Sequence, residues 1–119
     1  MLAQHDSRHF IACTSDGGQV CLSWRHARLE FAPSELLAMA DFLNETVPTL
    51  KTNTLLGNSL YCVLQDEDDN IEIWLLGVGF YMAPSEFRRF MTLIVDGAEA
   101  VRTIAQSVSE NPSKKEILH

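Results

Sequence analysis

The hydrophobic positions in the first half of the chain alternate with polar ones over a short stretch. Val20, Leu22 and Trp24 are separated by Cys21, Ser23 and Arg25, which is the period of a β-strand with one face on a core. An apolar run at 10–14 precedes it, and Asp16-Gly17-Gly18-Gln19 between the two supplies glycines for a tight hairpin turn. A third short strand is predicted at 27–31, which gives a three-stranded antiparallel meander.

The hydrophobic spacing then changes to that of a helix. Pro33 suits the first helical position and Glu35 the positive end of the helix dipole. Apolar residues follow at spacings of three and four, at Leu36, Met39, Ala40 and Leu43. A second such stripe at 87–94 continues through Ala98, Val101, Ala105 and Val108. Gly97 interrupts that stripe, so the pattern allows one long helix or two over 84–108.

An internal repeat organises the whole chain. Ala32-Pro33-Ser34-Glu35 recurs as Ala83-Pro84-Ser85-Glu86, and the same offset of 51 positions aligns apolar with apolar residues through most of each half. We therefore expect an α+β fold from an internally duplicated βββα unit, with about six antiparallel strands and two helices on one face. The repeats are placed at about 10–46 and 61–97 of a single domain over 1–119. The connection is placed at 47–58, and frayed ends are expected at 1–8 and 109–119.

The two repeats differ on the sheet face that should point away from the helices. The first repeat carries Ser23, Arg25, Arg28 and Glu30 there, which is typical of a solvated surface, whereas the second carries Trp74, Leu76, Gly79 and Tyr81. An apolar, aromatic face of this kind indicates a homodimer interface. Two alternatives stay open: the tail, the connection or a second sheet layer covers Trp74, or the face holds a small-molecule pocket with Arg25 and Arg28 as polar anchors.

Composition and charge narrow the possible partners. The 119 residues include sixteen acidic and nine basic side chains, for a net charge of −7. This charge repels phosphate backbones and anionic membranes, so neither nucleic acid nor a membrane is expected as a partner. The opening residues lack the apolar core of a signal peptide, which predicts a cytoplasmic protein. The odd number of cysteines, at 13, 21 and 62, predicts reduced and buried thiols.

The candidate chemistry does not assemble into a catalytic or metal site. Asp66-Glu67-Asp68-Asp69-Asn70 resembles the start of a calcium loop, but Ile71 and Gly77 stand where such a loop needs glycine and an acid. The histidines and cysteines lack the spacing of a zinc site. A cysteine nucleophile served by His26 would need that side chain to leave a hairpin tip. We expect no catalytic residue, metal or cofactor.

One segment resembles a known type of domain. Gly18 to Phe42, with Val20-x-Leu22, Leu29-x-Phe31 and Pro33-Ser34-Glu35-Leu36-Leu37, resembles short bacterial domains of unknown function that run hairpin, strand, helix. The resemblance implies the fold and no activity. The sequence as a whole predicts a non-catalytic, homodimeric interaction or regulatory module. The alternative is a small-molecule binding or catalytic domain that uses the Trp74 and Tyr81 face.

Overall fold

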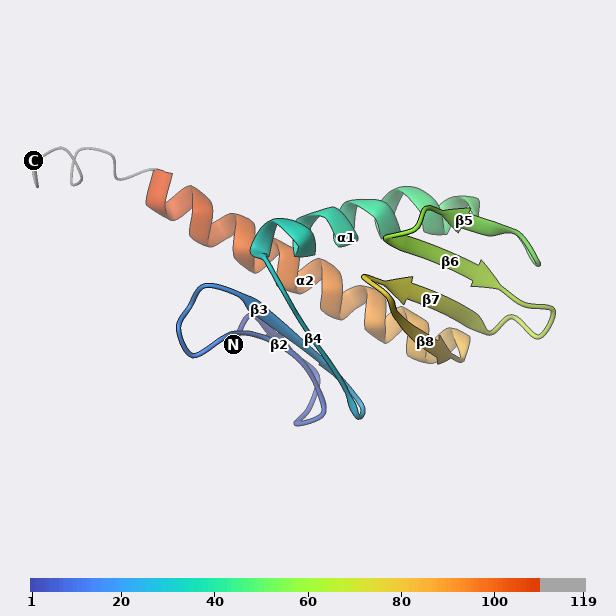
Figure 1. Cartoon of the computed structure of the whole chain (residues 1–119), viewed down its shortest axis with the longest axis horizontal. Helices are drawn as coiled ribbons and strands as arrows, with labels where there is room; N and C mark the ends of the chain where they lie inside the picture. Colours follow the sequence, from blue (N-terminus) through green and yellow to red (C-terminus); the bar gives the residue numbers. More distant parts are fainter. Residues whose placement is uncertain (110–119) are drawn as a thin grey trace, which may run out of the picture.

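The computed structural model describes residues 1–109 and has two four-stranded antiparallel sheets and two helices (Figure 1). The first sheet contains β1 (Ala3–Gln4), β2 (His9–Cys13), β3 (Val20–Trp24) and β4 (Ala27–Phe31) in that order. Helix α1 (Pro33–Thr46) and the 3-10 turn η1 (Val47–Thr49) follow. The second sheet contains β5 (Leu55–Gly57), β6 (Tyr61–Gln65), β7 (Ile71–Leu75) and β8 (Val78–Met82), and α2 (Pro84–Ser109) comes last. The α+β class is confirmed.

The predicted number of six strands is wrong, because each repeat gains a short edge strand. In the segment predicted to be frayed, β1 pairs with β2, and the Leu2 N–H donates to the Ile11 carbonyl at 2.8 Å. In the segment predicted to be a connection, β5 pairs with β6, with Leu55 opposite Leu64. Strands of two and three residues are too short to show a period in the sequence. They form because the neighbouring strand offers free backbone groups.

Three pairs of equivalent elements are separated by the predicted 51 positions, whereas β2 and β6 begin 52 positions apart. Strands β3 and β7, strands β4 and β8, and helices α1 and α2 each begin 51 positions apart. The β3–β4 and β7–β8 turns also match, because Arg25 and Leu76 both adopt positive φ, at 58° and 53°. Two-residue hairpins need this conformation. The C-terminal tail was predicted to be frayed over 109–119, and its residues 110–119 lie outside the described part of the chain.

Both helices begin at the proline that the sequence indicated, and a glutamate caps each start. The Glu35 carboxylate accepts a hydrogen bond from the Ala32 N–H at 2.9 Å, and Glu86 accepts one from Ala83 at 3.4 Å. Helix α2 runs without a break through Gly97, which decides in favour of one long helix. The C-terminal part of its 26 residues extends past the N-terminal start of α1 (Figure 1).

A single hydrophobic core joins both repeats. The strand residues on the helix-facing side are buried and pack with the apolar stripes of α1 and α2; they are Val20, Leu22, Trp24, Leu29 and Phe31 in the first repeat and Ile71, Ile73, Leu75, Phe80 and Met82 in the second. Phe90 of α2 lies at the centre, with its ring 5.0 Å from that of Trp24 and 5.6 Å from that of Phe80. One aromatic side chain therefore contacts both sheets. Within the described residues, no helix is long and apolar enough to cross a membrane.

Candidate functional site

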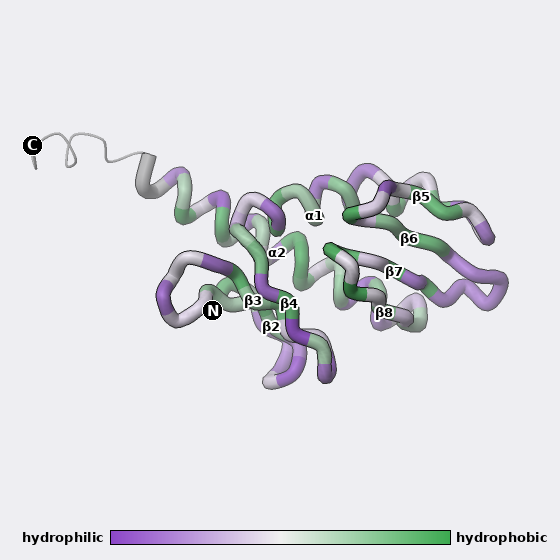
Figure 2. The backbone as a smooth tube through the Cα atoms, viewed as in Figure 1, coloured by the Kyte–Doolittle hydropathy of each residue, from purple (hydrophilic) through white to green (hydrophobic). Residues whose placement is uncertain are grey.

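The outer face of the second sheet is mostly apolar, with one charged side chain among the two rows that cross its four strands. The strand register aligns two rows of side chains on this face. We call the two rows the second-sheet face; they are Leu55, Leu64, Glu72 and Tyr81 in one and Gly57, Cys62, Trp74 and Gly79 in the other. Glu72 is the one charged side chain in these rows. Strands β6 and β7 are largely hydrophobic in Figure 2, and the turn between them is hydrophilic.

Trp74 and Tyr81 are the large aromatic residues of the second-sheet face. Their exposed fractions are 42% and 59%, and Leu55 at the other end of its row is 64% exposed. Within the described residues Trp74 is therefore partly exposed to solvent. A Cβ built on Gly79 would lie 2.9 Å from the indole. The indole thus lies flat across Gly79 of the neighbouring strand. This contact needs glycine, because any side chain there would displace the ring.

Tyr81 is held in place by the acidic turn between β6 and β7. Its hydroxyl donates to the Asp66 carboxylate at 2.5 Å. The hydrogen bond lowers the pKa of Asp66 and raises the pKa of Tyr81, because it favours the ionised carboxylate and the neutral phenol. Asp66 also accepts backbone hydrogen bonds from Asp68 and Asn70. Its role is therefore to order the turn and fix the direction of the tyrosine ring.

Two shallow depressions lie on either side of Phe80 and Tyr81. The first, of about 220 Å³, is lined by Glu72, Trp74, Gly79, Phe80 and Tyr81. The second, of about 230 Å³, lies between β8 and the β3–β4 hairpin and is lined by Trp24, Arg25, His26, Ala27, Phe80 and Tyr81. Strand β8 thus forms the ridge between the two hollows.

The structure brings together some of the predicted site residues and separates others. Trp74, Gly79 and Tyr81 share the second-sheet face. Arg25 lines the second depression and forms an ion pair with Glu86 of α2. Arg28 lies on β4 in the other sheet and lines neither depression. Leu76 lies in the β7–β8 turn and packs against the core. The predicted pair of arginine anchors is therefore not assembled.

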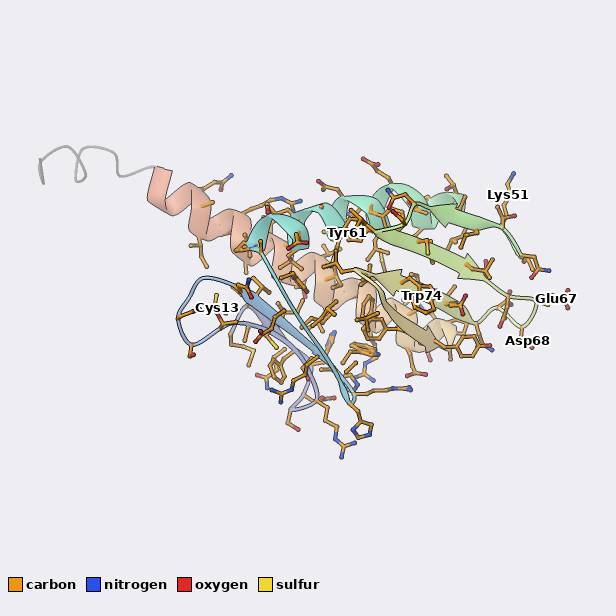
Figure 3. All side chains as sticks on the ribbon, viewed as in Figure 1. Cys13, Lys51, Tyr61, Glu67, Asp68 and Trp74 are labelled. Atoms are coloured by element: carbon orange, nitrogen blue, oxygen red, sulfur yellow. The ribbon has the colours of Figure 1, made fainter. Side chains whose placement is uncertain are left out.

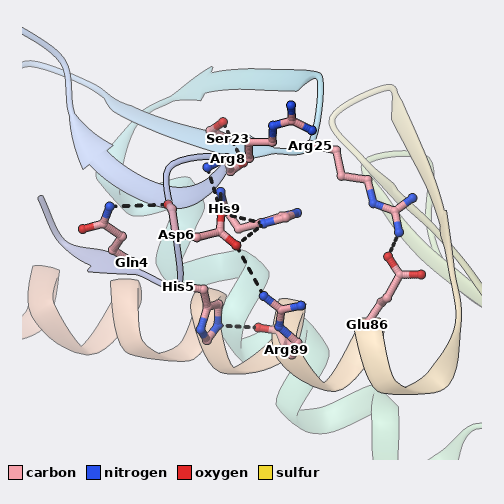
Figure 4. A network of polar contacts seen from close by, with 9 residues as sticks. All are labelled: Gln4, His5, Asp6, Arg8, His9, Ser23, Arg25, Glu86 and Arg89. Carbon is pink, nitrogen blue, oxygen red and sulfur yellow. Dashed lines mark hydrogen bonds and ion pairs between the residues drawn. The ribbon is translucent and has the colours of Figure 1, made fainter.

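The outer face of the first sheet also differs from the prediction. Ser23, expected in solvent, is 2% exposed, because its hydroxyl donates to the Arg8 carbonyl at 3.0 Å and the N-terminal segment covers it. Figure 4 shows the contacts that hold this segment. The Asp6 carboxylate contacts the His9 ring at 2.8 Å and Arg89 of α2 at 3.6 Å. This network is structural, since it fastens the first strands to α2.

The cysteines were expected to be buried, and this prediction is wrong. Cys13 is exposed at the end of β2, whereas Cys21 and Cys62 are half-buried. All three are free thiols, and Cys62 belongs to the second-sheet face beside Trp74. Figure 3 shows Cys13 in the first sheet, far from Trp74 and from Glu67 and Asp68 in the acidic turn. Among residues 1–109, no group of three or more metal-ligating side chains comes together.

Sequence reasoning missed Leu55, Leu64 and Cys62 as members of this face. For Leu55 the missing signal was β5, which the sequence placed in a connection, because its three residues show no alternation. Leu64 and Cys62 lie on β6, within the predicted second repeat, but were not assigned to this face. Once β5 is known, its register with β6 places Leu55 opposite Leu64 on this face. Comparison of the chain with protein-family models, with curated proteins and with solved structures finds no match.

Proposed function

We propose that this protein is a non-catalytic interaction module whose docking surface is the second-sheet face. The observation that carries the proposal is the exposure of Trp74, Tyr81 and Leu55 on one apolar sheet face. The largest exposed apolar patch of a protein is often a functional surface. The aromatic residues are of the type that supplies most of the binding energy at interfaces.

The two depressions beside Tyr81 argue against a small-molecule site on the second-sheet face; a larger hollow of about 410 Å³, lined by residues that include Val47, Phe87 and Arg88, lies elsewhere. Pockets for small ligands usually measure about 300–1,000 Å³ and enclose most of the ligand. The two depressions beside Tyr81 measure about 220 and 230 Å³ and are open to solvent. Arg25, a proposed polar anchor, is already paired with Glu86. A flat protein surface fits this geometry better than a metabolite.

We propose a second molecule of the same chain as one partner, and we expect that dimer to be weak. Four strands spaced about 4.8 Å apart and about 17 Å long present roughly 300 Å² of flat area. A stable interface buries about 800 Å² on each side. The second-sheet face alone is smaller than that, so the dimer should dissociate on dilution.

Sedimentation velocity over a wide concentration range tests this function. We expect the wild type to shift toward the dimer with rising concentration, and Trp74→Arg to remain a monomer with an unchanged circular dichroism spectrum. Ile104→Arg is the matched control, because Ile104 is 54% exposed on α2, outside the second-sheet face. Self-association that Trp74→Arg leaves intact would refute the docking surface. A wild type that stays monomeric at millimolar concentration would remove the second molecule as a partner.

A further inference from the structure

The backbone of β8 has unpaired groups on its outer side. Leu75 and Val78 flank a two-residue turn, so these two residues form a hydrogen-bonded pair. Along an antiparallel ladder, hydrogen-bonded pairs of residues alternate with non-hydrogen-bonded pairs. Phe80 and Met82 therefore bond to β7, whereas Gly79 and Tyr81 direct their N–H and C=O groups away from it. Strand β8 is the last strand of its sheet, and within residues 1–109 no other backbone group bonds to Gly79 or Tyr81.

The matching edge of the first sheet is protected, whereas that of β8 is not. At the offset of 51, the positions of Gly79 and Tyr81 correspond to Arg28 and Glu30 of β4. Charged side chains on an edge strand prevent pairing with another chain. The opposite edge of the second sheet, β5, has only three residues and ends at Gly57, whose φ is 119°. Strand β4 is as long as β8 but carries Arg28 and Glu30, and β5 is shorter. Among these three edges, β8 alone combines a length of five residues with the absence of charged side chains.

The depressions lie where an added strand would place its side chains. Successive side chains of a strand point to opposite faces, so a strand paired with β8 would direct one residue toward Trp74 and the next toward Trp24. The first depression is on the Trp74 side of β8 and the second is on the side of the β3–β4 hairpin. Figure 1 shows β8 as the edge of its sheet nearest to this hairpin. Strand addition obtains affinity from backbone hydrogen bonds and specificity from alternating pockets of this kind.

The charge of the site favours a basic segment. Glu72 lines the first depression, and no cation pairs with it in the described part of the chain. A lysine or arginine there would lay its aliphatic stem on Trp74 and bring its charge to the Glu72 carboxylate. Glu67, Asp68 and Asp69 in the nearby turn add to the same field. The second depression has Trp24, Ala27, Phe80 and Tyr81 in its lining, which suits an apolar side chain, and its polar residues are Arg25, already paired with Glu86, and His26.

We infer that β8 binds an extended segment of another protein as a fifth strand of the second sheet, with basic and apolar residues in alternation. The inference uses the proposed docking residue Trp74 but does not require a second molecule of this chain. Because the segment and a second molecule would both cover Trp74, binding of one excludes the other. The module would then be released from its weak dimer when the segment binds.

The test uses a capped heptapeptide, Lys-Val-Lys-Val-Lys-Val-Lys, with its glutamate counterpart as the control. We expect calorimetry to show binding of the lysine peptide only, and Glu72→Lys to weaken it about tenfold or more. Backbone amides of Gly79 and Tyr81 should exchange with solvent more slowly in the complex, whereas that of Gly17 in the first hairpin should not change. Tyr81→Pro, which lacks the outward N–H, should bind more weakly than Tyr81→Val, which keeps it.

The outcomes separate this inference from the proposed dimer. Absence of lysine-peptide binding, or binding that leaves amide exchange at Gly79 and Tyr81 unchanged, would overturn strand addition whatever the dimer does. The exchange measurement uses the wild type, so it decides the question even if Tyr81→Pro fails to fold. Peptide binding by a protein that never dimerises would support strand addition and remove the second molecule as a partner.

Discussion

Ile11 of β2 packs directly against Gly97 in the middle of α2. A Cβ atom built on Gly97 would lie 2.9 Å from the Cδ1 atom of Ile11, and both residues are buried. This contact explains why a residue that disfavours helices stands inside a helix of 26 residues. The glycine lets the first sheet approach α2 more closely than any side chain would allow.

We predict that Gly97→Ala destabilises the protein even though alanine is the better helix former. The gain in helix propensity is about 1 kcal/mol, whereas overpacking a core costs about 1–3 kcal/mol. The net loss should be about 1 kcal/mol, measured by urea denaturation. Ile11→Val removes the Cδ1 atom and costs about 0.5–1.5 kcal/mol alone. When it is combined with Gly97→Ala, the same change should cost nothing further, and additive losses would contradict the contact.

We predict a pH-dependent contribution from Asp6. The hydrogen bond from the His9 ring, together with the Arg8 N–H, lowers the pKa of Asp6 to about 2. A carboxyl whose pKa falls on folding stabilises the protein above its unfolded value of 3.8 and loses that contribution as the pH falls through 2. Asp6→Asn should therefore be less stable than the wild type at neutral pH, and the difference should vanish between about pH 4 and 2.

Denaturant titrations at several pH values check this prediction. Asp96→Asn on the exposed side of α2 is the control for removing a negative charge from an acidic protein. A difference between wild type and Asp6→Asn that stays constant down to about pH 2 would exclude the His9 contact as the source of the effect.

We predict that Ser23→Ala loosens the N-terminal segment. The buried hydroxyl of Ser23 donates to the Arg8 carbonyl, and a hydrogen bond of this type contributes about 0.5–1.5 kcal/mol. The variant should lose about 1 kcal/mol of unfolding free energy. Amide exchange at Leu2, which donates to Ile11 in β1–β2 pairing, should become faster. Ser34→Ala on the exposed start of α1 is the matched control, and equal losses in the two variants would contradict the assigned role.

Most of the helical and strand structure could be predicted, because it depends on local periodicity. The β3, β4, β7 and β8 positions and the starts of both helices follow from alternation, from the proline at each helix start and from the repeat. The burial of Trp24 and the position of Trp74 on the outer face also follow, because they fall on opposite faces of matching strands, whereas the sequence left open whether another segment covers Trp74.

The rest of the fold depends on contacts between distant segments, which local patterns do not encode. Strand β1 exists only because β2 offers it backbone partners, and the same holds for β5 beside β6. The burial of Ser23 depends on the Arg8 carbonyl, fifteen positions away. The candidate site was therefore predicted in its centre, at Trp74 and Tyr81, and missed at its far edge, at Leu55.

We predict that the Arg25–Glu86 ion pair contributes little to stability. The pair joins the β3–β4 turn of the first repeat to the first turn of α2, but the two side chains are 51% and 29% exposed. Ion pairs with this exposure typically contribute about 0–1 kcal/mol. Glu86 also caps α2 through the Ala83 N–H, so Glu86→Ala should cost more than Arg25→Ala.

A double-mutant cycle isolates the pair from the cap. We expect the coupling free energy between Arg25→Ala and Glu86→Ala to be below about 1 kcal/mol at low salt and to shrink further at about 1 M salt, where exposed charges are screened. Glu35→Ala gives the cost of removing the equivalent capping glutamate from α1. A salt-independent coupling of several kcal/mol would contradict this prediction, because it would mean that the pair is shielded from water and locks the two repeats together.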